Sequence, residues 1–358
     1  MVKREELNLQ FPASLGFAAF IIIIAGIIYA ESIITPLLMA FFISIICAQP
    51  IMWLKKKKVP QNLAVTIVII VIVSVFIGFG ELIGNSLSSF SENAPKYEQN
   101  LSEIGANIFQ VLNDKGINVS TSKISEIIEP SRIMGATAGL LGQLGSFMGN
   151  TLTIFFLVLF LLLELDSVTL KAKALSQNTN VSLSYLNTIG QNIRHYLSIK
   201  TMTSLLTGLL IWISLAIIGV DYAIIWALIA FLLNYIPNIG SIIAAIPAVL
   251  FALVQLGLGG VIWTAIVFTA VNMLIGNIVE PKMMGKGLGL STFVVFVSLI
   301  FWGFILGTIG MFLSVPLTMT IKIILEQNEK TKWIAVILGT DEDALAIMDE
   351  KSDESSDD

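Results

Sequence analysis

The most informative part of this chain is residues 234–247, which read NYIPNIGSIIAAIP. The apolar runs 223–233 and 248–256 flank it, and each is too short to cross a bilayer alone, since a spanning helix needs about 20 apolar residues. Pro237 lacks the backbone donor that a helix requires, and Gly240 tolerates backbone angles that other residues resist. We therefore predict a polar turn that interrupts a membrane segment. Its polar and small residues are Asn234, Asn238, Gly240 and Ser241.

A second interruption of the same kind lies near the end of the apolar region. The runs 292–304 and 311–324 are joined by a stretch that contains Gly307 and Gly310, and Pro316 follows shortly after it. Non-helical backbone at membrane depth survives only where it is buried in protein or lines a wet cavity. Paired, interrupted hydrophobic segments are the best sequence indication of a transporter's binding site. The alternative is a pair of helical hairpins that only pack against their neighbours.

Composition supports a polytopic, all-α membrane protein. Of 358 residues, 56% are hydrophobic and 13% are charged, whereas soluble domains carry about 25% charged residues. The single cysteine, Cys47, and the single histidine, His195, exclude a disulfide framework and a metal site built from several such ligands. A P-loop and a nucleophile–base pair are also missing from the sequence. We expect no cofactor, no metal, no catalytic residue, no nucleic-acid partner and no enzymatic activity.

Four consecutive lysines, residues 55–58, predict the orientation in the membrane. Short loops rich in lysine and arginine stay on the cytoplasmic side. With about eight membrane segments, both termini then face the cytoplasm. A role for these lysines in binding anionic lipid is the alternative interpretation.

The hydropathy pattern divides the chain into five regions. We expect N-terminal membrane helices in 1–80, amphipathic extracytoplasmic helices in 81–145, and a membrane helix with a cytoplasmic amphipathic connector in 146–200. Residues 201–326 form the expected transport core with two broken, re-entrant hairpins. Residues 327–358 form an expected acidic cytoplasmic tail, since nine acidic residues and one lysine fall in 341–358.

Glu280 is the leading candidate for an ionisable residue inside the membrane. An acidic side chain at a helix centre costs about 2.5–3.5 kcal/mol to insert, so a carboxylate found there is a functional candidate. The alternative places Glu280 at the interface, paired with Lys282 or Lys286, with Pro281 ending the helix. The amides of Asn234, Asn238, Asn272 and Asn277 both donate and accept hydrogen bonds. Such a lining suits a small polyhydroxylated solute or a monovalent cation.

Three stretches of the chain resemble the autoinducer-2 exporter family of bacterial membrane proteins. They are IGVDYAIIWALIAFLLNYIPNIGSIIAAIPAVL at 218–250, NIVEPKMMGKGLGLSTFVVFVSLIFWGFILGTIGMFLSVPLT at 277–318, and YLNTIGQNIRHYL at 185–197. The resemblance implies an inner-membrane transporter with about eight segments, some re-entrant, that assembles as a homo-oligomer, with a pentamer as the expected form. It also implies elevator-like movement of one domain against another. Ser241 and the pair Ser291–Thr292 depart from the family pattern, which usually has proline at the first position and His-Pro at the second.

The sequence thus predicts a secondary transporter that exports a small polar solute, such as the signalling molecule autoinducer-2. Some members of the resembled family are sodium(lithium)/proton antiporters, so cation exchange through Glu280 is the rival mechanism. A membrane scaffold or regulator without a substrate is the alternative from another class. Because no ATP-binding motif is present, active transport would depend on an ion or solute gradient.

Overall fold

The computed structural model describes residues 13–114, 152–164, 184–284 and 289–341, together with residues 135, 138, 139, 142, 167, 170, 171 and 345. Every regular element within these ranges is a helix. In the described part of the chain, five helices are long and apolar enough to cross a membrane, and shorter apolar helices lie at Leu15–Tyr29, Leu152–Glu164 and Ala223–Leu233. The prediction of an all-α polytopic membrane protein is therefore confirmed, while the number of eight segments stays a prediction.

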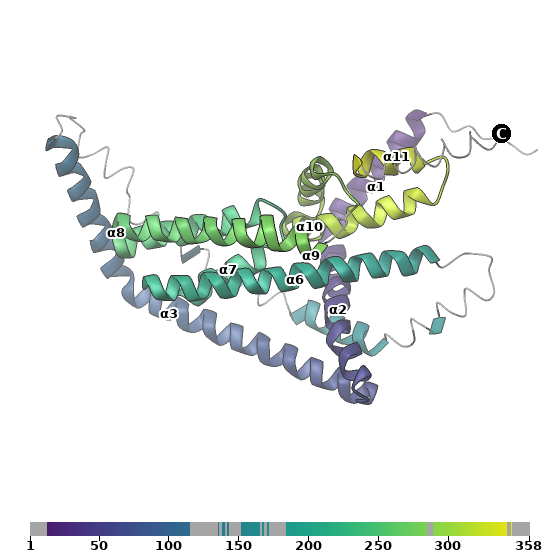
Figure 1. Ribbon diagram of the computed structural model, residues 1–358, viewed down its shortest axis with the longest axis horizontal. Coiled ribbons are helices and arrows are strands. Elements are labelled where there is room, and N and C mark those ends of the chain that lie inside the picture. Colours follow the sequence, from purple (N-terminus) through teal and green to yellow (C-terminus); the bar gives the residue numbers. More distant parts are fainter. Residues whose placement is uncertain are drawn as a thin grey trace, which may run out of the picture.

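Three helices form the N-terminal part of the molecule: α1 (Ala13–Tyr29), α2 (Glu31–Lys56) and α3 (Gln61–Asp114). With 54 residues, α3 is about 80 Å long at 1.5 Å per residue. It continues without a break through residue 80, where the sequence predicts a change from membrane helix to amphipathic pieces. Figure 1 shows a bend in α3, and Pro95 lies inside this helix, where it removes a backbone hydrogen bond and kinks the helix.

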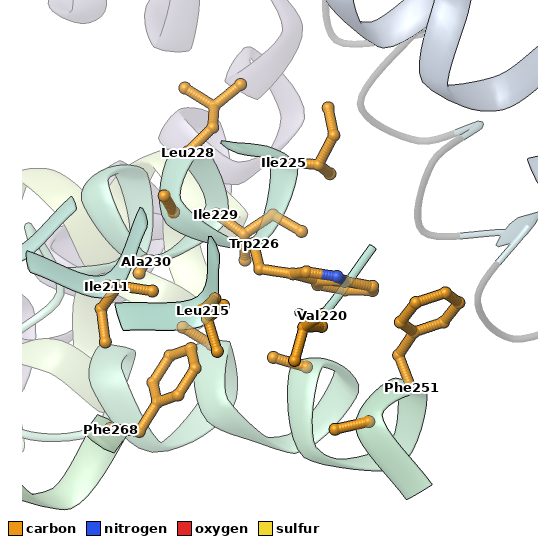
Figure 2. Close-up of a cluster of buried hydrophobic side chains, with 14 of the residues drawn as sticks. Ile211, Leu215, Val220, Ile225, Trp226, Leu228, Ile229, Ala230, Phe251 and Phe268 are labelled. Carbon is orange, nitrogen blue, oxygen red and sulfur yellow. The ribbon is translucent and has the colours of Figure 1, made fainter. Parts of the chain in front are cut away.

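The centre of the molecule contains α6 (Ser184–Ile218), α7 (Ala223–Leu233) and α8 (Gly240–Leu274), which run side by side (Figure 1). They enclose the largest cluster of buried apolar side chains (Figure 2). Trp226 is 1% exposed, and its ring lies 5.4 Å from that of Phe251. The C-terminal half of α3 adds Phe90 and Tyr97 to the same cluster, so this half of α3 belongs to the packed core.

Two long helices are interrupted by glycines. Helix α8 breaks at Gly257 (φ 68°, ψ −157°), and α10 (Thr292–Glu326) breaks at Gly307 (φ 61°, ψ −150°). Residues other than glycine hardly ever adopt these angles. In α10 the indole of Trp302 donates a hydrogen bond of 3.0 Å to the hydroxyl of Thr318, although 16 residues of straight helix span about 24 Å. Helix α10 therefore folds back on itself where the sequence predicts the second interruption.

The returning segments start with glycines that lie against backbone carbonyl groups. Gly240 packs on the carbonyl of Leu233, and Gly310 packs on that of Trp302, so neither position has room for a Cβ atom. These close approaches explain why glycine occupies both turns. The position of the two hairpins within a bilayer stays a prediction.

The remaining elements are a π-helix η1 (Ile275–Val279), α9 (Glu280–Met284) and α11 (Lys332–Leu338). The amide of Ser291 donates a hydrogen bond of 3.2 Å to the carbonyl of Leu338, which ties α11 to the start of α10. The region predicted as an acidic tail therefore begins with a packed helix. Its residues after 341, apart from 345, lie outside the described residues, as do Lys286 and most of 115–151.

Candidate functional site

A row of polar side chains runs along one face of α6. Lys200, Thr203, Ser204 and Thr207 are all buried, and their spacing of three or four residues places them on the same side of the helix. Burying a polar group is costly unless it finds a partner. This polar face of α6, defined by these four residues, therefore organises the elements that pack on it.

Glu280 lies against this face. The ammonium of Lys200 donates a hydrogen bond of 2.7 Å to Oε1 of Glu280, and the two side chains are only 5% and 16% exposed. The hydroxyl of Thr203 lies 3.5 Å from the second carboxylate oxygen. The predicted alternative, in which Glu280 pairs with Lys282 or Lys286, is wrong for Lys282, because Lys200 occupies the carboxylate and Lys282 is exposed.

The π-helix explains how Glu280 reaches α6. Helix η1 ends at Val279, directly before Glu280, and its wider turn rotates the residues that follow relative to a continuous α-helix. Pro281 sits in the first turn of α9, where a missing backbone donor is tolerated. Asn277 is exposed within η1, and Asn272 is half-buried beside the backbone of Gly276. Neither amide contributes a hydrogen bond to the Lys200–Glu280 pair.

The tip of the first hairpin docks one turn further along the same face. The amide of Asn234 donates a hydrogen bond of 3.0 Å to the hydroxyl of Ser204, and both groups are buried. The hydroxyl of Tyr235 donates to Thr201 at 2.8 Å. The ring of Tyr235 also stacks on Phe312 of α10, with centroids 6.1 Å apart. The two hairpins thus meet at this aromatic pair.

The other predicted residues of the first turn shape its backbone. Asn238 adopts a left-handed conformation (φ 60°) and is exposed, while Pro237 and Ser241 are half-buried. Asparagine tolerates positive φ better than most residues, which explains its use here. Among the predicted amides, only Asn234 joins the polar face of α6 through a hydrogen bond.

The second interruption lies at a different place. Gly307 faces the carboxylate of Glu31 at the start of α2, Gly310 packs on Trp302, and Pro316 is buried within the returning half of α10. The predicted site residues therefore divide into one group on α6 and another between α2 and α10.

Sequence reasoning missed the polar face of α6, although the signal is present. Residues 200–207 read KTMTSLLT, and the polar positions recur every three or four residues within an apolar helix. Lys200 instead falls at the end of the region 146–200, where the sequence predicts a cytoplasmic amphipathic connector. The neighbouring polar residues reveal that the lysine belongs to a buried face.

The arrangement combines one ammonium group, one carboxylate, several hydroxyls and one amide. No group of three or more metal-ligating His, Cys, Asp or Glu side chains occurs among the described residues. Ionisable side chains buried within membrane helices mark substrate and ion pathways. The cluster therefore suits the hydrogen bonding of a small polar solute or the exchange of a proton or a monovalent cation.

Broken apolar helices that bring buried charged and polar side chains together define the class of polytopic membrane transporters. The family model described as AI-2E family transporter matches residues 17–330. This chain belongs to that family.

Several relatives match over most of their length. A transport protein of Haemophilus influenzae is 42% identical over 346 residues, which cover 95% of this chain and 99% of the relative. The AI-2 transport protein TqsA of Escherichia coli K12 is 38% identical over 318 residues, which cover 89% of this chain and 92% of TqsA. The transport protein YhhT of the same strain is 34% identical over 325 residues, which cover 91% of this chain and 93% of YhhT.

Proposed function

We propose that this protein is a secondary transporter of the bacterial inner membrane that exports a small polar solute such as autoinducer-2. The observation that carries the proposal is the buried Lys200–Glu280 pair beside the docked tip of the first hairpin. The name of the relative TqsA, an AI-2 transport protein, supports the choice of solute.

The polar face of α6 supplies groups that a solute can use in place of their present partners. The hydroxyls of Thr203 and Ser204 and the amide of Asn234 can each donate and accept hydrogen bonds. A polyhydroxylated solute that replaces the bond between Asn234 and Ser204 would separate the hairpin tip from α6. In this proposal, solute binding and hairpin movement are therefore the same event.

We further propose that both termini face the cytoplasm and that the protein assembles as a homo-oligomer, with a pentamer as the expected form. The lysine run at 55–58 supports the orientation through the positive-inside rule. The resemblance of residues 218–250 and 277–318 to autoinducer-2 exporters supports the assembly.

A sodium(lithium)/proton antiporter is the second candidate, and the ion pair itself favours it. The carboxylate of Glu280 is largely buried, and its partner is the ammonium group of Lys200. A monovalent cation can take the place of this ammonium group, or a proton can bind to the carboxylate. Either exchange compensates the carboxylate, and the ammonium of Lys200, which is 5% exposed, must then release a proton or move to water, because a buried unpaired charge is costly.

Flux measurements in proteoliposomes test both candidates. Autoinducer-2 efflux should fall strongly in Glu280→Gln and Asn234→Ala, whereas Glu164→Gln should match the wild type, because Glu164 pairs with Lys171 on the surface with half its side chain exposed. The antiporter predicts that added sodium or lithium dissipates an imposed pH gradient, and that Glu280→Gln abolishes this response.

Two outcomes would overturn the proposed function. Efflux and exchange that are unchanged in Glu280→Gln would show that the ion pair is not part of the pathway. A folded oligomer that moves neither the solute nor cations would instead favour the scaffold interpretation, in which the helices only bind partner proteins.

A further inference from the structure

The turn of the second hairpin lies against an acidic side chain of α2. A Cβ atom added to Gly307 would lie 3.0 Å from Oε1 of Glu31, and no other described side chain comes within 4 Å of that position. Glu31 is half-buried, and among the described residues no basic side chain lies within ion-pair distance of it. The carboxylate therefore sits beside the broken backbone of α10 without a cationic partner.

A second oxygen lies one helical turn further along α2. Thr35 is 9% exposed, and its hydroxyl is buried with no hydrogen-bond partner among the described residues. Such orphaned polar groups are rare in native structures and call for an explanation. The cost of leaving a buried hydroxyl unpaired is avoided if a ligand uses it.

The packing of α2 shows which way Thr35 faces. Leu38 and Phe42 follow it at intervals of three and four residues, and they contribute to the same apolar cluster as Ile309 and Phe312 of α10. Residues at this spacing share one side of a helix. Glu31 and Thr35 therefore lie on the face of α2 that packs on the second hairpin, next to which α2 passes in Figure 1.

Backbone oxygens complete the set of possible ligands. Pro36 lies inside α2 and cannot donate to the carbonyl of Ser32, which loses its helical partner. The break at Leu306 and Gly307 interrupts the regular hydrogen bonding of α10 in the same way. Unwound backbone carbonyls of broken helices are typical ligands of sodium ions in transporters.

We propose that a dehydrated monovalent cation, with Na⁺ as the best match, binds between Glu31, Thr35 and the Gly307 turn. All of the available ligands are oxygens, as hard cations prefer, and a single carboxylate balances a single positive charge. Ca²⁺ and Mg²⁺ sites usually use more than one carboxylate or several waters. The inference concerns cation binding alone, so it goes beyond the proposed transport activity and does not depend on it.

Calorimetric titration of the purified protein in detergent with NaCl tests this site, with choline chloride keeping the ionic strength constant. The wild type should bind Na⁺ saturably. Glu31→Gln removes the charge and Thr35→Val removes only the hydroxyl, and each should weaken binding about tenfold or more. Glu164→Gln should bind Na⁺ like the wild type, because its carboxylate lies elsewhere on the surface and holds a lysine partner.

Each alternative result would overturn the cation site. A wild type that gives no saturable heat, or a heat equal to that of choline, would show that no specific site exists. Unchanged affinity in Thr35→Val, which keeps the volume of the side chain and should fold, would show that Na⁺ binds elsewhere. Loss of binding in Glu280→Gln alone would move the cation to the Lys200 pair. Solute efflux measured on the same variants separates failure of this site from failure of transport.

Discussion

The two hairpins use the same backbone device but rest on different supports. In both, a returning helix starts at a glycine, Gly240 or Gly310, that lies against a carbonyl of the outgoing segment. The first tip is held by hydrogen bonds from Asn234 and Tyr235 to α6. The second is held by its own halves and by α2. A broken helix therefore indicates where the backbone turns, and its neighbours decide which polar groups meet there.

The difference extends to the hydrophobic cores. The first hairpin shares its buried cluster with the C-terminal halves of α3 and α6, whereas the second shares a separate cluster with α2 and with Tyr196 and Leu197 of α6. Helix α6 is the element common to both clusters. The two hairpins are therefore coupled in two ways, through α6, where the Lys200–Glu280 pair lies, and through the direct contact of Tyr235 with Phe312.

Removing the ammonium of the buried pair should have the largest effect on stability. In Lys200→Met the carboxylate of Glu280 stays buried without its partner, which costs about 3–5 kcal/mol. Lys171→Met is the matched control, because its ion pair with Glu164 has the same kind of geometry but side chains that are 68% and 51% exposed. Exposed pairs contribute about 0–1 kcal/mol. Unfolding midpoints in detergent compare the two variants.

The double variant Lys200→Met/Glu280→Leu sharpens this test. Replacing both charges with apolar groups should recover most of the lost stability, since the cost comes from the unpaired charge. Equal destabilisation by Lys200→Met and Lys171→Met would contradict the assignment of a buried pair.

Substituting alanine for the glycines at the helix breaks should have the next largest effect on stability, and the effect should differ between the two positions. Alanine at position 257 or 307 has to adopt positive φ, which costs about 1–3 kcal/mol. Gly257 has open space around it, whereas the new methyl group of Gly307→Ala meets the carboxylate of Glu31. We therefore expect Gly307→Ala to lose about 1 kcal/mol or more beyond Gly257→Ala, as measured by thermal unfolding. The combination Gly307→Ala/Glu31→Ala should remove that excess, and an unchanged excess would contradict the contact.

The sequence alone allows the turns at 234–241 and 307–310 to be predicted, because proline and glycine act locally, whereas the break at Gly257 is not among its predictions. It also allows Glu280 and Asn234 to be selected, since both are polar residues within apolar runs. Lys200 as the partner of Glu280 could not be found in this way, because the pairing depends on the packing of helices 80 residues apart. The π-turn before Glu280 leaves no local signal. The continuous α3 was missed because falling hydrophobicity alone does not end a helix.

Removing the hydrogen bond between Asn234 and Ser204 at the tip of the first hairpin should cost less stability than Gly307→Ala. Asn234→Ala leaves the hydroxyl of Ser204 buried without this donor, which costs about 1–3 kcal/mol. Asn238→Ala is a useful comparison, since Asn238 is exposed at the same turn, although it also loses a side chain that tolerates positive φ. In thermal unfolding, the double variant Asn234→Ala/Ser204→Ala should therefore lose about as much stability as Asn234→Ala alone, because the second substitution removes the unpaired hydroxyl. Additive losses in the double variant would contradict the bond.

The base of the first hairpin provides the smallest and most specific test. The hydroxyl of Tyr97, on the C-terminal half of α3, donates a hydrogen bond of 2.9 Å to the carboxylate of Asp221, just before α7, and lies 3.5 Å from the hydroxyl of Tyr222. Tyr97→Phe removes these hydroxyl contacts alone, because the ring still stacks on Phe90 and meets Phe251 edge-on. Since Asp221 is exposed and water can replace the lost donor, we expect a loss of about 0.5–1.5 kcal/mol in thermal unfolding. Asp221→Asn keeps an acceptor and should lose less, while a loss in Tyr97→Phe that exceeds that of Asn234→Ala would show that α3, rather than α6, is the main support of the first hairpin.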